Sequence, residues 1–111
     1  MKTYRLAVSR RADRDADTIY DWLAERSVAG ATRWFQALRT ALRGLTTNPE
    51  GHARAPEAET VGRDVRQALF KTRRGRIYRV LYVVADEVVH VVAIRGYGQD
   101  IASRDDLELP S

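Results

Sequence analysis

The sequence contains no cysteine, which excludes disulfide bonds and thiolate metal sites. This absence is typical of proteins from a reducing compartment. No apolar run approaches the roughly 20 residues that a membrane-spanning helix needs. The N-terminus carries basic residues but lacks the apolar stretch of a secretory signal. These absences favour a cytoplasmic protein that has no membrane partner.

Lysine is scarce: it occurs only at positions 2 and 71, so arginine supplies nearly all of the positive charge. The net charge is +4 and the isoelectric point is about 9.8. From Arg54 to Arg79 eight basic residues outnumber three acidic ones, whereas the segment after Gln99 is acidic. A basic middle of this kind favours a nucleic-acid or acidic-protein partner. An arginine-rich solvated surface is the alternative interpretation.

A chain of 111 residues, 44% of them hydrophobic, fits one domain with its own core. We expect this domain to span residues 1–99. Residues 100–111 form an acidic tail without a core pattern, which we expect to be loose or to contain a short helical turn.

The N-terminal half predicts a short strand followed by two helices. Residues 3–8 alternate apolar and polar side chains, which is typical of a strand. Apolar residues spaced by three and four predict helices over about 10–26 and 28–45, with Ser9 and Ser27 as N-caps. The short connection between them predicts an antiparallel helical hairpin. Four acidic residues of the first helix are expected to be solvated: Asp13, Asp15, Asp17 and Asp21.

The C-terminal half predicts a sheet. Residues 49–64 have no apolar period, so we expect an unstructured loop. Three antiparallel strands follow over about 65–72, 76–85 and 88–95. They are joined by a turn at residues 73–75, in which Gly75 supplies a positive φ, and by a turn at residues 86–87. In the last strand Val89, Val91 and Ala93 are expected to share one face.

The order strand, helix, helix, strand, strand, strand cannot form a doubly wound parallel sheet. We therefore predict an α+β fold, in which a short N-terminal strand and an antiparallel two-helix hairpin pack with a mainly antiparallel sheet. The hairpin covers one face of this sheet, and the other face is left exposed or meets a partner. Beyond Arg76, the middle strand is apolar on both faces except at Arg79.

Several motifs follow one another along nearly the whole chain. They are Val8–Ser9, Ile19-x-x-x-Leu23, the stripe from Ala31 through Trp34–Phe35 to Leu45, Asn48–Pro49–Glu50, Val65–Arg66, Tyr78–Arg79–Val80–Leu81–Tyr82, Val91–Arg95 and Gln99–Asp100. In this order and spacing they resemble the RelE/ParE superfamily of bacterial type II toxin–antitoxin toxins, and within it the ParE-like branch. The resemblance implies a small toxin that needs no cofactor and is neutralised by a co-expressed antitoxin.

The resemblance leaves open whether the chain is a nuclease. RelE-like members are ribosome-dependent endonucleases that cut messenger RNA, whereas ParE-like members are associated with inhibition of DNA gyrase. Metal-free RNA cleavage needs a base, an acid and a cation that stabilises phosphate charge. By resemblance Arg79 is the candidate cation, Glu50 lies near a glutamate base, and Tyr97 lies at the end of the sheet.

This catalytic set is partial because no histidine accompanies Tyr97. Each member also has a structural alternative. Glu50 is then a solvated loop acid, Arg79 is ion-paired to an antitoxin or to an internal carboxylate, and Tyr97 caps the sheet edge. The two histidines, His52 and His90, have no partner at ligand spacing, so we expect no metal site.

The leading hypothesis is a ParE-like toxin that inhibits growth by binding a cellular target such as DNA gyrase and is neutralised by its antitoxin. Antitoxin or target would dock on a basic sheet surface, where complementary charge speeds association. The candidate docking residues are Arg66, Lys71, Arg73, Arg74, Arg76, Arg79 and Arg95. One alternative is a RelE-like interferase that cuts messenger RNA on the ribosome with Arg79 and Tyr97. Another is a non-toxic nucleic-acid or protein-binding module.

Overall fold

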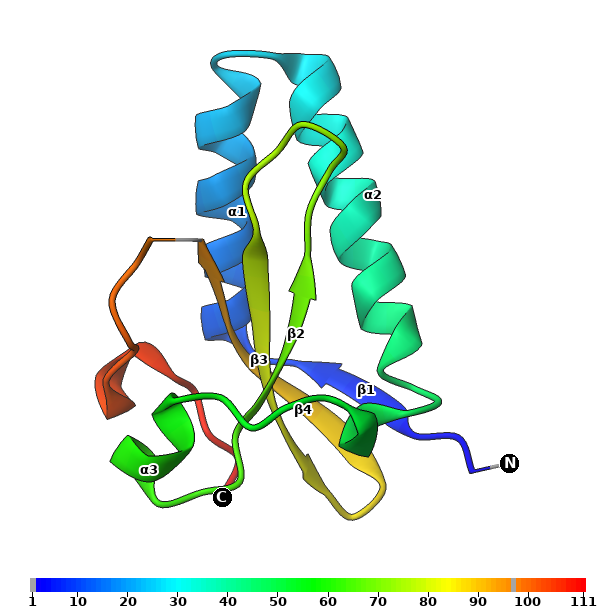
Figure 1. Cartoon of the computed structure of the whole chain (residues 1–111), viewed down its shortest axis with the longest axis vertical. Helices are drawn as coiled ribbons and strands as arrows, with labels where there is room; N and C mark the ends of the chain where they lie inside the picture. Colours follow the sequence, from blue (N-terminus) through cyan, green and yellow to red (C-terminus); the bar gives the residue numbers. More distant parts are fainter. Residues whose placement is uncertain (1, 97) are drawn as a thin grey trace.

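The computed structural model describes residues 2–96 and 98–111 (Figure 1). Its elements are β1 (Arg5–Val8), α1 (Arg10–Ala24), α2 (Val28–Gly44), the 3-10 helix η1 (Pro49–Gly51), α3 (Glu57–Val61), β2 (Arg66–Phe70), β3 (Tyr78–Ala85), β4 (Val88–Gly96) and the 3-10 helix η2 (Arg104–Asp106). The strand order in the sheet is β1-β4-β3-β2. Strand β1 runs parallel to β4, and the other two pairs are antiparallel. The predicted α+β class is confirmed.

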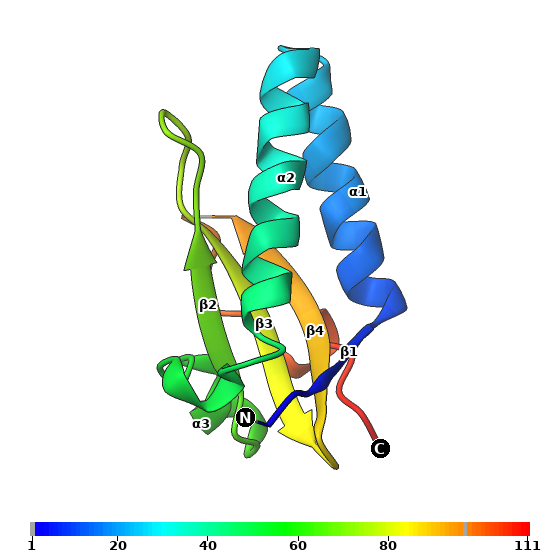
Figure 2. The same ribbon diagram turned by 90° about the vertical axis from the view of Figure 1, so that its right-hand side faces the viewer.

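The helical hairpin packs on one face of the sheet (Figures 1 and 2). Both predicted caps are present: Ser9 Oγ accepts a hydrogen bond from the Ala12 N–H, and Ser27 Oγ accepts one from the Gly30 N–H, each at 3.0 Å. Each cap satisfies an amide that has no partner within its helix. The buried residues of this face are Ala12, Trp34, Leu38, Leu45, Ala68, Phe70, Val80, Tyr82, Val89, Val91 and Ile94.

Asp15 departs from the expectation that the acidic residues of α1 are solvated. Its Oδ2 accepts a hydrogen bond from the Ile94 N–H at 3.0 Å, and its Oδ1 accepts one from Arg11 Nε at 3.0 Å. Only 17% of its side chain is exposed. Asp15 therefore ties α1 to a backbone amide of β4.

The pairing of β3 with β4 contains a bulge. Leu81 lies opposite Ala93 and Tyr82 lies opposite Val91, so Val92 is an extra residue in β4. An extra residue reverses the side-chain alternation beyond it. Ala93 consequently packs on the face away from the helical hairpin, and the prediction that it shares a face with Val91 is wrong.

The expectation of an unstructured loop over residues 49–64 is also wrong. This segment contains η1 and α3, and Ala58 and Val61 of α3 are only 2% and 3% exposed. Gly62, with φ of 67°, is left-handed, and its N–H bonds to the Ala58 carbonyl to end the helix. A helix of 5 residues is too short to show an apolar period in the sequence. Its stability comes from packing rather than from propensity.

The second face of the sheet is largely covered. Helix α3 and the C-terminal segment pack there, and the buried residues are Ala55, Ala58, Val61, Val65, Leu81, Val83, Val92, Ala93, Ala102 and Leu107. The prediction of an open second face is correct only near the β2–β3 turn, where Leu69 and Ile77 are 58% and 37% exposed. The C-terminal segment is thus packed rather than loose, although the domain boundary at residues 99/100 stays a prediction.

The two strand turns differ in how far they follow the prediction. Asp86 and Glu87 both have positive φ, 52° and 62°, as a tight two-residue hairpin requires. Gly75 does not have a positive φ, so the predicted reason for that glycine is wrong. A Cβ at Gly75 would instead collide with the hydroxyl of Thr72.

The turn between α1 and α2 and the turn between β2 and β3 extend toward the same end of the molecule (Figure 2). A cleft lies between them. In the part of the chain that the structure describes, no helix is long and apolar enough to cross a membrane.

Candidate functional site

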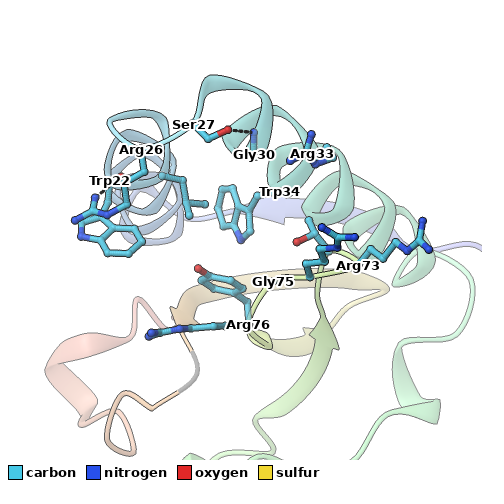
Figure 3. A pocket seen from close by; sticks show the side chains of 13 residues that line it. Trp22, Arg26, Ser27, Gly30, Arg33, Trp34, Arg73, Gly75 and Arg76 are labelled. Atoms are coloured by element: carbon cyan, nitrogen blue, oxygen red, sulfur yellow. Dashed lines mark hydrogen bonds between the residues drawn. The ribbon is translucent and has the colours of Figure 1, made fainter.

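A candidate site is the cleft between the α1–α2 turn and the β2–β3 turn, with a volume of about 530 Å³ (Figure 3). Its lining combines arginine and aromatic side chains without any carboxylate. The lining residues are Trp22, Leu23, Arg26, Ser27, Gly30, Arg33, Trp34, Thr72, Arg73, Arg74, Gly75, Arg76 and Tyr78.

The helical side of this cleft is ordered by local contacts. Arg26 donates a hydrogen bond to the Trp22 carbonyl at 2.7 Å, and its guanidinium lies over the Trp22 ring at 3.6 Å from the ring centroid. Trp22 lies in the last turn of α1, and Arg26 lies two residues beyond the end of this helix, so the contact folds the start of the α1–α2 turn back onto α1. The Ser27 cap places the N-terminus of α2 at the cleft, and the first turn of α2 carries no acidic residue.

The floor of the cleft is aromatic. Trp34 is 2% exposed, and its ring lies 5.6 Å from that of Tyr78 and 5.9 Å from that of Phe70, centroid to centroid. The Trp34 Nε1–H has no hydrogen-bond partner among the described residues. Burial raises the pKa of Tyr78, and the positive charge of Arg76 partly offsets this rise. Tyr78 therefore stays neutral at physiological pH.

The seven basic residues predicted for docking do not form one surface. Arg73, Arg74 and Arg76 line the cleft, and Lys71 is exposed beside them. The other three contact the protein's own chain. Arg66 donates to the carbonyls of Glu50 and His52, at 3.1 and 2.7 Å, and so holds the segment before α3.

Arg79 lies on the face of the sheet away from the helical hairpin and is engaged by Glu57. Its two terminal nitrogens donate to the two carboxylate oxygens of Glu57 at 2.9 and 2.8 Å, and one of them also donates to Gln67 Oε1 at 3.0 Å. Glu57 is fully buried and also accepts the Ala102 N–H at 2.8 Å. Of the alternatives for Arg79, the structure contains the internal carboxylate.

Arg95 lies opposite Arg79 in the sheet and holds the C-terminal segment. Its guanidinium donates to the Asp100 carbonyl at 2.8 Å and lies 4.0 Å from the carboxylate of Asp106. Hydrogen bonds from Ser103 lower the pKa of Asp106, with smaller contributions from the charges of Arg95 and Arg11. Asp106 is therefore ionised beside Arg95 at neutral pH.

Glu50 is not among the hydrogen-bond partners of Arg79 in the described part of the chain. Glu50 is exposed and accepts a hydrogen bond from the Tyr4 hydroxyl at 3.2 Å. Tyr97 lies outside the described residues. Among residues 2–96 and 98–111 there is no group of three or more side chains that could hold a metal ion.

Residues 6–101 match the family described as ParE toxin of type II toxin-antitoxin system, parDE. The chain belongs to the ParE toxin family. No curated protein matches the sequence significantly. The family implies a cognate ParD antitoxin as the partner of this toxin.

Sequence reasoning missed two features of this ParE-family toxin. Glu57 reads as one more acid in a charged loop, and nothing local distinguishes it from Glu59. Trp34 is predicted only as part of an apolar helix stripe and Trp22 only as a residue flanking one, although both line the cleft. The spacing of Trp22 and Arg26 was a readable signal, because an arginine four residues after a tryptophan can stack on its ring at the end of a helix.

Proposed function

We propose that this toxin arrests growth by binding a protein target, with DNA gyrase as the first candidate, and that it does not cleave RNA. The observation that carries this proposal is the bidentate contact between Arg79 and the buried Glu57. A nuclease of this fold would need Arg79 for the phosphate. Here that phosphate would have to displace Glu57 and leave its buried carboxylate without a counter-charge, at a cost of several kcal/mol.

A second line of support is the surface around the β2–β3 turn, which we call the hairpin surface. It consists of Leu69, Lys71, Arg73, Arg74, Arg76 and Ile77. Its two apolar side chains are exposed next to four positive charges. An acidic amphipathic segment complements this combination, because its apolar side chains cover Leu69 and Ile77 while its carboxylates meet the basic rim. We propose that the ParD antitoxin supplies that segment.

The remaining predicted docking residues act indirectly in this proposal. Arg66, Arg79 and Arg95 hold the segment before α3, α3 itself and the C-terminal segment, respectively. They shape the sheet rather than contact the antitoxin. A partner that meets the hairpin surface therefore finds a preformed surface, which lowers the entropic cost of binding.

The target is tested by inducing the chain alone in bacteria and following the DNA-damage response and messenger RNA integrity in the same cultures. We expect growth arrest with a DNA-damage response and intact messages, and we expect the purified toxin to inhibit supercoiling by purified gyrase. Rapid cleavage of translated messages with unaffected supercoiling would instead favour the RelE-like alternative.

The docking surface is tested with a matched pair of substitutions. Ile77 and Leu6 are almost equally exposed, 37% and 36%, but Leu6 lies on β1 at the opposite edge of the sheet. Ile77→Asp places a negative charge on the hairpin surface, so we expect it to weaken ParD binding by about tenfold or more. Leu6→Asp is expected to leave the affinity unchanged. Equal affinity losses in the two variants would refute the assignment.

A further inference from the structure

We propose that the cleft between the α1–α2 turn and the β2–β3 turn binds a nucleobase with adjacent phosphates, either as a free nucleoside diphosphate or triphosphate or as part of a single-stranded nucleic acid. The cleft shares Arg73, Arg74 and Arg76 with the hairpin surface, whereas Arg26, Arg33 and Trp34 of its helical side belong to the cleft alone (Figure 3). Nucleotide binding is measured on the toxin alone, and antitoxin binding is tested at Ile77, which does not line the cleft, so a failure of this proposal is distinguishable from a failure of the proposed function.

The first argument is charge. Five guanidinium groups line the cleft without a carboxylate among the lining residues. The one acidic contact of these arginines within 4 Å in the described chain is Glu25, which lies 3.9 Å from Arg26 and is 75% exposed. Five like charges around one small volume repel one another, and a compact multivalent anion relieves that repulsion. Arginine forks match phosphate oxygens in a bidentate manner, and the nearby N-terminus of α2 adds a further positive potential.

The second argument is the aromatic surface inside this ring of charge. Trp22 is 50% exposed and carries the Arg26 guanidinium over its ring, while Trp34 and Tyr78 meet edge to face at the floor. Nucleobases stack on aromatic rings and on guanidinium planes, at about 1–3 kcal/mol per base. A base with adjacent phosphates therefore matches both parts of the lining, whereas inorganic phosphate matches only one.

The third argument is an unsatisfied donor. Trp34 is only 2% exposed, and its Nε1–H has no hydrogen-bond partner among the described residues. Buried polar groups without a partner are uncommon and call for an explanation. A ring nitrogen, carbonyl or phosphate oxygen carried to the floor of the cleft would accept this hydrogen bond after a small movement of the surrounding rings.

The size of the cleft favours a nucleotide over an amphipathic peptide helix. Its volume of about 530 Å³ lies within the range of small-molecule sites. Its apolar floor consists only of Leu23, Trp34 and Tyr78, encircled by arginines. A helical peptide needs a longer apolar groove with anchors on successive turns. The exposed apolar residues of the hairpin surface suit such a peptide better.

The test uses the intrinsic fluorescence of the full-length toxin, since both of its tryptophans line the cleft. Titration with ADP, pyrophosphate, adenosine and an octaglutamate peptide separates the contributions of base and charge. We expect ADP to change the fluorescence and to bind about tenfold or more tighter than pyrophosphate or adenosine. Equal binding of ADP and pyrophosphate, or equal binding of octaglutamate and ADP, would overturn the proposal.

A charge-matched pair of variants locates the site. Arg33→Gln with Arg73→Gln removes two charges from the cleft, and Arg14→Gln with Arg39→Gln removes two exposed charges outside it. The first pair is expected to weaken ADP binding by about tenfold or more, and the control pair by less than about twofold. Urea unfolding checks that both pairs fold. Equal losses of ADP affinity in the two double variants would mean that ADP is attracted non-specifically by positive charge, and would refute the assignment of the site to the cleft.

A second titration, with single-stranded oligothymidylate of about ten nucleotides, distinguishes a free nucleotide from a single-stranded nucleic acid as the ligand. Tighter binding of the oligonucleotide than of ADP, with the same loss in the Arg33/Arg73 variant, assigns the cleft to single-stranded nucleic acid. Tighter binding of ADP assigns it to a free nucleotide. Absence of binding by all nucleotide probes at millimolar concentration would refute the site.

Discussion

At the scale of single residues, Glu57 connects three parts of the chain that are distant in sequence. It belongs to α3, pairs with Arg79 of β3 and accepts the backbone N–H of Ala102. Glu57 is 0% exposed, so its carboxylate depends on these contacts for its hydrogen bonds and its counter-charge. The carboxylate therefore fixes how α3 and the C-terminal segment lie on the sheet.

Glu57→Gln should destabilise the fold. The amide keeps the shape of the side chain but leaves the Arg79 charge without a counter-charge, and breaking a buried pair costs about 3–5 kcal/mol. Arg79 is 15% exposed, so we expect the lower end of that range. Urea unfolding measures the change. Glu59→Gln, an exposed position on the same helix, is the control, and equal stability of the two variants would contradict the role of the pair.

Because of Glu57, we expect the stability of the folded toxin to decrease in acid. Burial alone raises the pKa of Glu57, but the hydrogen bonds from Arg79 and from the Ala102 N–H outweigh it and hold the pKa below its ordinary value of 4.5. The folded state thus binds this proton less tightly than the unfolded state. Its contribution to stability is complete above about pH 4.5 and disappears as the pH falls through the lowered pKa.

The measurement is the free energy of unfolding between neutral pH and pH 3, compared for the wild type and Glu57→Gln. The variant should lose less stability on acidification. Asp106 also has a lowered pKa, so some acid dependence should remain. Parallel pH profiles would show that Glu57 does not contribute.

At the scale of elements, the C-terminal segment (residues 100–111) packs across the second face of the sheet, and we call it the strap. Arg104 donates to the Val61 carbonyl at 2.7 Å, and Arg63 donates to the Pro110 carbonyl at 3.2 Å. The Glu108 N–H donates to the Val92 carbonyl at 3.1 Å. These contacts join the segment to α3 and β4, so it stabilises the sheet rather than hanging free.

Leu107→Ala tests this strap. Leu107 is 7% exposed, and its truncation leaves a cavity against the second core cluster, so we expect a loss of about 2–5 kcal/mol. Ile101→Ala is the control because Ile101, in the same segment, is 57% exposed. Thermal unfolding of the two variants gives the comparison. A loose tail would make both substitutions neutral.

At the scale of the whole molecule, charge is segregated. The cleft and the β2–β3 turn carry five arginines and Lys71, whereas α1 and the C-terminal segment carry most of the acidic residues. A net charge of +4 with this arrangement produces a positive potential at one end of the molecule. An acidic partner approaching from solution is therefore steered toward the hairpin surface.

The association rate with the antitoxin should consequently fall with ionic strength. Between about 50 and 500 mM salt we expect a decrease on the order of tenfold or more, because the Debye length shortens from more than 10 Å to a few Å. Replacing Arg73, Arg74 and Arg76 together by glutamine should flatten this dependence. Stopped-flow mixing provides the rates, and an unchanged salt slope in the triple variant would contradict steering by this turn.

Three of the five arginines of the candidate cleft were predicted from the sequence, but Arg26, Arg33 and the two tryptophans were not. Arg73, Arg74 and Arg76 stand out as a cluster in a turn. Nothing local indicates that this turn reaches the end of α1, because the two segments are separated by about 50 residues. The pairing of Arg79 was likewise left open between a partner and an internal carboxylate.

The sequence alone determined the elements whose signals are local: the two capped helices, the tight turn at Asp86–Glu87 and the apolar faces of β3. Caps and periodic stripes depend on neighbours one to four residues away, which the sequence displays directly. Only the tertiary structure decided the Glu57–Arg79 pair, across 22 residues, and the Glu57–Ala102 contact, across 45. Contacts at such separations depend on how the sheet, α3 and the C-terminal segment pack, and no local pattern encodes that packing.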